Sequence, residues 1–149
     1  MRTHTQTSSI AVSVPITVEF EDVDSFGIVH YVKYIAYLER ARMRLLSRLG
    51  FDIASCPVAP VLYELSIRYR KPARLSEELI VEAWVEAVEE LRIVLSYKVC
   101  RGSETLSLAK TVIAFADLGA GTLAPVPTAL IEALSEGSSE LLRTKKDSC

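Results

Sequence analysis

The chain has 149 residues and a formal net charge of −2, with 17 Lys and Arg against 19 Asp and Glu. Half of the residues are hydrophobic and 24% are charged, which is typical of one folded domain with a sizeable core and excludes extensive disorder. Because there is no basic excess, we expect no binding to long nucleic acid through its phosphates.

Membrane insertion and secretion are not expected from this sequence. No apolar run reaches the roughly 18 residues that span a bilayer. The N-terminal stretch lacks the apolar core of a signal peptide, since its apolar piece at 10–14 is short and interrupted by Ser13. Cys56, Cys100 and Cys149 have no paired spacing and are typical of free thiols in a reducing compartment. We therefore expect a cytoplasmic protein.

The predicted domain occupies residues 15–135. Residues 1–14 and 136–149 are rich in Ser, Thr and charge, so both ends are predicted to be flexible. The first element is a short strand at 16–20, where apolar and polar residues alternate.

One long amphipathic helix is predicted next. From Tyr31 to Leu49 the apolar residues recur with helical spacing, and charged residues such as Arg40 and Arg44 lie mostly on the other side. Gly50 then supplies a stop signal.

Four further strands and a short helix complete the predicted domain. The strands are expected at 61–70, 79–88, 91–100 and 105–118, and the helix at 128–134. The short gaps predict antiparallel neighbours. Because a five-stranded antiparallel sheet must cover its apolar face, the long helix is expected to pack against it in an α+β fold.

The residues best suited to catalysis or ligand binding lie in the stretch EDVDSFGIVHYVKY at 21–34, where an acidic turn runs directly into the long helix. Unpaired N–H groups and the helix dipole favour an anion there, or an oxygen that gains negative charge. A carbonyl under nucleophilic attack has such an oxygen, and Asp24 would supply an attacking group or a base.

Two segments resemble one known family. DVDSFGIVHYVKYIAYLERAR at 22–42 and YRKPARLSEEL at 69–79 resemble the hallmark segments of the 4-hydroxybenzoyl-CoA thioesterase-like and YbgC-like proteins of the hotdog superfamily. The resemblance covers about residues 15–135. It implies a hotdog fold with a five-stranded sheet wrapped around the helix, and a homodimer with active sites between subunits. Whether two dimers pair into a tetramer stays open. It also implies hydrolysis of an acyl-CoA or acyl carrier protein thioester without metal or other cofactor.

The resemblance also assigns roles to individual residues. Asp24 matches the catalytic carboxylate, which acts either as nucleophile through a mixed anhydride or as general base toward water. Tyr31 matches the residue whose backbone amide polarises the thioester carbonyl. The residues expected to bind substrate are Gly27, Ile28, Val29, His30, Arg70 and Lys71.

Several alternatives stay open at this stage. Asp24 could be a turn or capping residue, and Asp22 is interpreted as turn chemistry, since no third ligand completes a metal site. His30 could tune Asp24 or simply be a polar residue at the helix end. Glu39, on the helix, is a possible secondary carboxylate, or else an ion-pair partner of Arg42 or Arg68 or simply a solvent-exposed residue. Tyr34 and Tyr37 are expected in the core or an interface.

The carrier also stays open. Glu89 and Glu90 stand where some members of this family place basic residues against the nucleotide. Either Arg92, Lys98 or Arg101 substitutes for them, or the carrier is acyl carrier protein. The predicted activity is acyl thioester hydrolysis, and the alternative is a non-catalytic hotdog module that binds acyl thioesters. A hydratase is disfavoured, because DSFGIVH at 24–30 lacks a D-x-N-x-x-H arrangement.

Overall fold

The computed structural model describes residues 10–136, so predictions for 1–9 and 137–149 lie outside the described residues. The elements, in chain order, are β1 Ala11–Thr17, the short 3-10 helix η1 Phe20–Asp22, α1 Tyr31–Arg48, β2 Ala59–Tyr69, β3 Glu78–Val88, β4 Arg92–Arg101, β5 Glu104–Asp117, β6 Thr122–Ala124 and a helix at 128–136.

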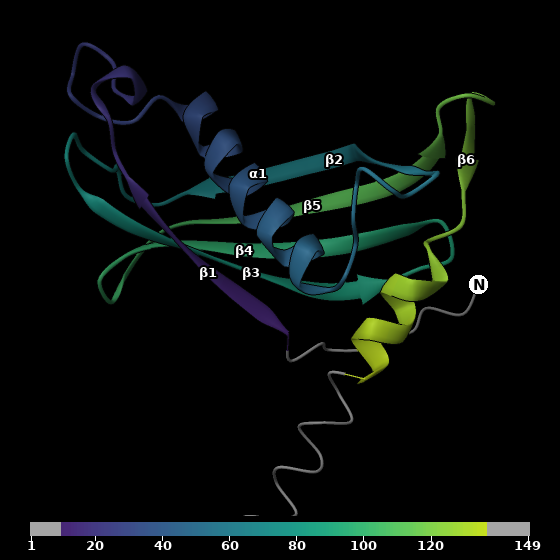
Figure 1. Cartoon of the computed structure of the whole chain (residues 1–149). Coiled ribbons are helices and arrows are strands. Elements are labelled where there is room, and N and C mark those ends of the chain that lie inside the picture. The colour runs from purple at the N-terminus through teal and green to yellow at the C-terminus, as the bar shows by residue number, and fades with distance from the viewer. Residues whose placement is uncertain (1–9, 137–149) are drawn as a thin grey trace, which may run out of the picture.

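The strands form one antiparallel sheet in the order β1-β3-β4-β5-β2, and β6 pairs with the end of β5. The helix α1 lies across one face of this sheet (Figure 1). Arg101 and Glu104 pair on either side of a two-residue turn, which is why β4 and β5 are neighbours. The predicted α+β architecture, one long helix against an antiparallel sheet, is confirmed.

The core lies between α1 and the sheet. The inward side of α1 carries Tyr34, Tyr37, Leu38, Ala41, Leu45 and Leu46, all buried. Alternate residues of β3 and β4 face them and are almost fully buried, namely Leu79, Val81, Ala83, Val85, Ile93, Leu95, Tyr97 and Val99. Complete burial of one such leucine stabilises the fold by about 2 kcal/mol relative to exposure. The predicted apolar stripe of the helix therefore does bind the apolar face of the sheet.

The predicted first strand at 16–20 is wrong. β1 runs from Ala11 to Thr17, with alternate residues buried, and Phe20 belongs to η1. Proline breaks a central strand, but β1 is an edge strand that pairs only with β3, and an edge tolerates the missing N–H of Pro15. The sheet therefore begins before residue 15.

Two smaller differences concern the chain after β5. The short strand β6 was not predicted, because three residues carry too little periodicity to detect. The helix predicted at 128–134 covers residues 128–136.

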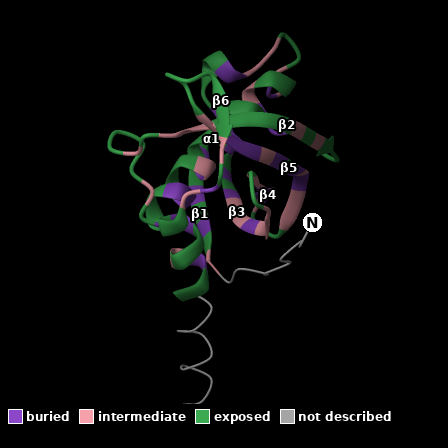
Figure 2. Cartoon of the chain, turned by 90° about the vertical axis from the view of Figure 1, so that its right-hand side faces the viewer, coloured by how far each residue is buried: buried purple, intermediate pink, exposed green. Residues whose placement is uncertain are grey.

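The two edges of the sheet differ in chemistry. β2 exposes large apolar side chains, namely Val61, Leu62, Tyr63 and Tyr69, and Figure 2 shows most of this strand coloured as exposed. On the opposite edge, β1 exposes the smaller Ala11, Ser13, Pro15 and Thr17. β2 is therefore the edge with apolar surface left to bury.

Candidate active site

The predicted acidic turn closes on itself directly before α1. His30 donates its backbone N–H to the Asp22 carbonyl at 2.9 Å, and Asp24 donates its own to the Ile28 carbonyl at 2.9 Å. At the tip, Gly27 has φ 74°, a left-handed conformation that other residues adopt at a cost of about 1–2 kcal/mol. The turn therefore returns Asp24 to the neighbourhood of the helix start.

One oxygen of the Asp24 carboxylate holds the turn. Oδ1 accepts the backbone N–H of Phe26 at 2.8 Å and that of Ile28 at 3.5 Å. Oδ2 has no partner among the described residues, and the side chain is half-buried. The turn role considered from sequence is therefore real, and it leaves one carboxylate oxygen available to a ligand.

The first turn of α1 offers unpaired donors. His30 is the N-cap, and its side chain makes no capping hydrogen bond. The backbone N–H groups of Tyr31 and Val32 donate to no carbonyl or side chain within residues 10–136. Tyr31 as a whole residue is 67% exposed, while its carbonyl accepts a hydrogen bond from the Tyr69 hydroxyl at 2.9 Å. The backbone of Tyr31 can therefore bind a ligand oxygen, and its ring lies outside the core.

The base of the turn is held by a buried carboxylate. Asp22 Oδ2 accepts the Tyr37 hydroxyl at 2.8 Å and the Glu19 backbone N–H at 3.0 Å, and Lys33 Nζ lies 3.8 Å from Oδ1. Burial, and then the hydrogen bond to Asp22, raise the pKa of Tyr37 well above its ordinary value, so the phenol stays protonated and donates. Asp22 thus links the turn to the middle of α1.

The second sequence motif lies against the first. Val29 donates its N–H to the Ala73 carbonyl at 2.9 Å, and Ile28 forms a β-bridge with Arg74. Ala73 in turn donates to the Tyr34 hydroxyl at 3.2 Å. The structure therefore brings together the two motifs that stood far apart in the sequence.

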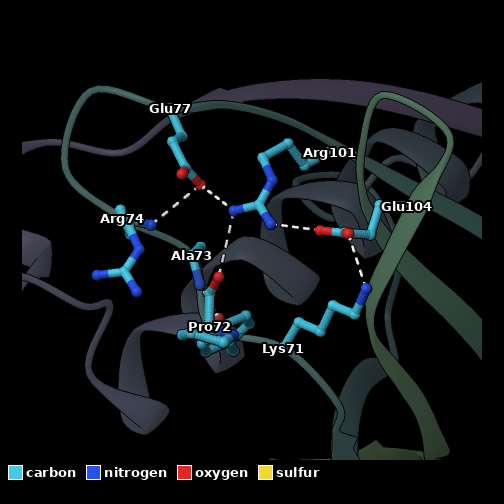
Figure 3. A network of polar contacts seen from close by, with 8 residues as sticks. Lys71, Pro72, Ala73, Arg74, Glu77, Arg101 and Glu104 are labelled. Atoms are coloured by element: carbon cyan, nitrogen blue, oxygen red, sulfur yellow. Dashed lines mark hydrogen bonds and ion pairs between the residues drawn. The ribbon is translucent and has the colours of Figure 1, made fainter.

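An ion-pair network fixes the loop that carries the second motif (Figure 3). The Arg101 guanidinium donates to Glu77 at 2.6 Å, to the Pro72 carbonyl at 3.3 Å and to Glu104. Lys71 Nζ lies 2.8 Å from a Glu104 oxygen. The loop is therefore clamped to β4 and β5 beside the turn that bears Asp24.

The predicted substrate-binding residues have different surroundings. Val29 is buried, and its N–H is bonded within the fold. The charge of Lys71 is offset by Glu104, whereas the side chain of Arg70 is exposed and has no partner in the described chain. His30 is exposed, and Gly27 and Ile28 are half-buried at the turn. Of the possible replacements for basic nucleotide contacts, Arg92 pairs with Glu89 at 2.7 Å and Arg101 belongs to the network above.

A cavity of about 180 Å³ lies between α1 and the β2 side of the sheet. Its apolar lining consists of Ile35, Leu38, Leu62 and Leu65. Its polar lining consists of Glu39, Arg42, Tyr97 and Thr111. Tyr31, Ile35 and Arg42 lie on one stripe of α1, since their spacings of four and seven residues bring them to the same face. The cavity therefore lies along the stripe that begins at Tyr31.

The secondary carboxylate predicted on the helix lies at the rim of this cavity. The Glu39 side chain is 61% exposed, and its Oε1 lies 3.4 Å from Arg42 Nη2. The ion-pair interpretation of Glu39 is therefore confirmed. Among the described residues, no group of three or more His, Cys, Asp or Glu side chains could hold a metal ion.

Comparison with known proteins identifies the family. Residues 18–134 match the family described as the thioesterase-like superfamily. The chain belongs to this superfamily. The predicted resemblance is thereby confirmed, as is the enzyme class that it implied, a hydrolase of acyl thioesters.

Individual members of the superfamily agree with this assignment. The acyl-CoA thioesterase YbgC of Haemophilus influenzae is 33% identical over 111 residues, which cover 72% of this chain and 82% of that protein. The acyl-CoA thioester hydrolase YbgC of Escherichia coli O157:H7 is 28% identical over 62% of this chain and 71% of its own.

A solved structure supports the fold. The 1,4-dihydroxy-2-naphthoyl-CoA thioesterase Slr0204 of Synechocystis superposes with a TM-score of 0.76 over 84% of this chain and 96% of that one, at 20% identity. The predicted hotdog architecture is confirmed. No helix within residues 10–136 combines the length and apolar character needed to cross a bilayer.

Two parts of the site were missed by the sequence interpretation. Asp22 was assigned to a turn, and nothing in the spacing shows that Tyr37 binds its carboxylate. Arg42 was not singled out as a cavity residue. It does follow Leu38 by four residues and Ile35 by seven, so its place on the apolar stripe was a readable signal.

Proposed function

We propose that this protein hydrolyses acyl-CoA thioesters at the junction of the acidic turn and α1, with Asp24 as the reacting carboxylate. The observation that carries the proposal is the pairing state of Asp24, whose Oδ1 is held by the turn while Oδ2 has no partner in the described chain. The named activities of the two YbgC relatives support acyl-CoA as the carrier.

The carbonyl oxygen of the thioester accepts a hydrogen bond from the Tyr31 backbone N–H. That group lies at the positive end of the α1 dipole, where an oxygen that gains negative charge is stabilised. Removal of one such donor typically costs about 100- to 1,000-fold in rate. The exposed Tyr31 ring is not needed for this role.

Two routes are compatible with an available Asp24 oxygen. As a nucleophile, Asp24 attacks the carbonyl carbon, the thiolate leaves, and water hydrolyses the mixed anhydride to restore the carboxylate. As a general base, Asp24 removes a proton from the water that attacks. Label found in Asp24 after turnover in heavy-oxygen water would establish the nucleophilic route, because only attack of water on the Asp24 carbon of the anhydride introduces the label there.

The acyl group occupies the cavity between α1 and the sheet. Its apolar walls and its place on the Tyr31 stripe of α1 suit a chain that extends away from the reacting carbonyl. The exposed Arg70 is the remaining predicted contact for the anionic carrier, because Lys71 is paired with Glu104.

The active unit is a homodimer joined through the β2 edge. Val61, Leu62 and Tyr63 are exposed on β2, an edge strand that pairs only with β5, and an exposed apolar edge is a ready template for pairing with another chain. Because Leu62 also lines the cavity, the second subunit would close the acyl site. Cys100 is a free, buried thiol, and free thiols are typical of proteins in a reducing compartment such as the cytoplasm.

The test is hydrolysis of a panel of acyl-CoA esters, followed by detection of the free thiol. Asp24→Asn keeps the Oδ1 acceptor for Phe26 but removes the charge, so kcat/KM should fall by about 100- to 10,000-fold. Asp52→Asn is the matched control, since Asp52 makes a similar turn contact to the Ala54 N–H after the other end of α1.

Other outcomes would reject the proposal. Full activity of Asp24→Asn with loss of activity in Glu39→Gln would transfer the catalytic role to Glu39. Tight binding of intact acyl-CoA by the wild-type protein, without release of thiol from any ester, would favour a binding module instead.

A further inference from the structure

One wall of the cavity includes the Arg42 guanidinium, which is only partly paired. Arg42 Nη2 lies 3.4 Å from an oxygen of the largely exposed Glu39, whereas Arg42 Nε is buried and has no hydrogen-bond partner among the described residues. A buried donor without an acceptor costs free energy. A ligand that brings an acceptor into this cavity would recover it.

A second donor lies on the sheet side of the same cavity. The Tyr97 and Thr111 hydroxyls are 2.8 Å apart and buried, and either can donate to the other. Two hydroxyls joined by one hydrogen bond have one proton left to offer. Burial raises the pKa of Tyr97 to about 12, so at neutral pH the pair is a donor and carries no charge.

We propose that Arg42, with the Tyr97–Thr111 pair, binds a neutral oxygen at the far end of the acyl group, so that the enzyme prefers acyl thioesters with a terminal hydroxyl over unsubstituted ones. This inference rests on the proposed function, because it places the acyl group in the cavity. Arg42 is then a specificity-determining residue.

The charges favour a neutral oxygen over a carboxylate. Glu39 lines the same cavity and already offsets the charge of Arg42. A carboxylate on the substrate would therefore meet a like charge beside its partner, which costs free energy, whereas a hydroxyl oxygen accepts from Nε without that repulsion.

The geometry also limits the length of the acyl group. Tyr31 and Arg42 are three helical turns apart, about 16 Å along the axis. Side chains of a helix lean toward its N-terminus, which brings the guanidinium closer to Tyr31. The hydroxyl should therefore be at the end of a medium-length chain and not beside the thioester.

The experiment compares matched pairs of substrates on the full-length protein. Hexanoyl-, octanoyl-, decanoyl- and dodecanoyl-CoA are each paired with the counterpart that has a terminal hydroxyl and with one that has a terminal carboxylate. The measured quantity is the ratio of kcat/KM within each pair. This ratio does not depend on the fraction of folded enzyme, so a variant of reduced stability remains informative.

For the wild type we expect the hydroxyl form of at least one length to exceed the unsubstituted form by about 10- to 100-fold. Arg42→Met keeps the length of the side chain but removes the donor, so the ratio should fall to near one. Tyr97→Phe should lower it in part. The matched control is Arg44→Met, which removes an exposed arginine of the same helix and should leave the ratio unchanged.

A wild-type ratio near one at every length, an equal ratio in Arg42→Met, or a preference for the carboxylate would overturn the inference. In each of these cases the unsubstituted esters are still hydrolysed through Asp24, so the proposed function survives. Absence of hydrolysis of every ester would instead reject the proposed function itself.

Discussion

The hydroxyl of Tyr37 donates a 2.8 Å hydrogen bond to the buried carboxylate of Asp22, and this bond connects the middle of α1 to the turn that carries Asp24. The Asp22 carbonyl meanwhile accepts the backbone N–H of His30, the N-cap of α1. One residue thus fixes both the helix start and the base of the turn. Loss of its partner should disturb the reacting geometry without removing any reacting group.

Tyr37→Phe tests this link. Asp22 would keep its Glu19 contact but lose a buried donor, which should reduce the free energy of unfolding by about 1–3 kcal/mol. Because small displacements of a reacting group are costly, kcat should fall about 10- to 100-fold, with KM much less affected. Chemical unfolding and steady-state kinetics measure the two effects. Ser13→Ala, which removes an exposed hydroxyl on β1, is the control, and a kcat equal to wild type in Tyr37→Phe would disprove the link.

Gly27 offers a test of the turn itself. Its φ of 74° is unfavourable for alanine, although no atom lies within 4 Å of an added Cβ. Gly27→Ala should therefore destabilise the protein by about 1–2 kcal/mol through backbone strain alone. Gly27→Asn should cost less, because asparagine tolerates this conformation better. Thermal unfolding of both variants checks the order, and equal stability of wild type and Gly27→Ala would contradict it.

The sequence allowed the start of α1 at Tyr31 to be predicted, because the acidic turn ends there and the apolar stripe of the helix begins. Its end beside Gly50 was equally readable, and Gly50 does have a positive φ. The start of β1 was not, since Pro15 looks like a boundary until the strand is known to lie at an edge. The local sequence pattern therefore located most elements. Whether a strand lies at the edge or in the centre of the sheet depends on the whole sheet, so the local pattern does not predict it.

The candidate site divides in the same way. Asp24 and the Tyr31 amide could be named because a turn and a helix start are local features. The Asp22–Tyr37 bond and the pairing of Lys71 with Glu104 depend on contacts across the fold, the second over 33 positions of sequence. Arg70 and Lys71 looked alike in the sequence. The structure distinguishes them, because Glu104 of the neighbouring β4–β5 hairpin pairs with Lys71.

The proposed dimer predicts a specific effect of charge on β2. Lysines in place of both Val61 and Tyr63 would put charge on the exposed apolar edge. A strand of a second subunit that paired there would exclude water from these charges, so pairing would be disfavoured. Light scattering should show a monomer, and kcat/KM should fall if the partner closes the acyl site. Ser13→Lys on β1, the other edge, should leave the assembly unchanged. A dimeric β2 variant with wild-type activity would exclude this interface.

The network around Arg101 predicts how stability changes in acid. Hydrogen bonds from Lys71 and then Arg101 hold the pKa of Glu104 below its ordinary value of 4.5. A carboxyl with a lowered pKa in the folded state stabilises it above the unfolded pKa, and this stabilisation is lost as pH falls through the folded pKa. Glu104→Gln should therefore be less stable than wild type at neutral pH, and the difference should shrink as pH falls below 4.5. Urea unfolding across this range measures it, with Glu132→Gln, an exposed residue of the helix at 128–136, as control. A difference that stays constant with pH would show that the network does not depend on the Glu104 charge.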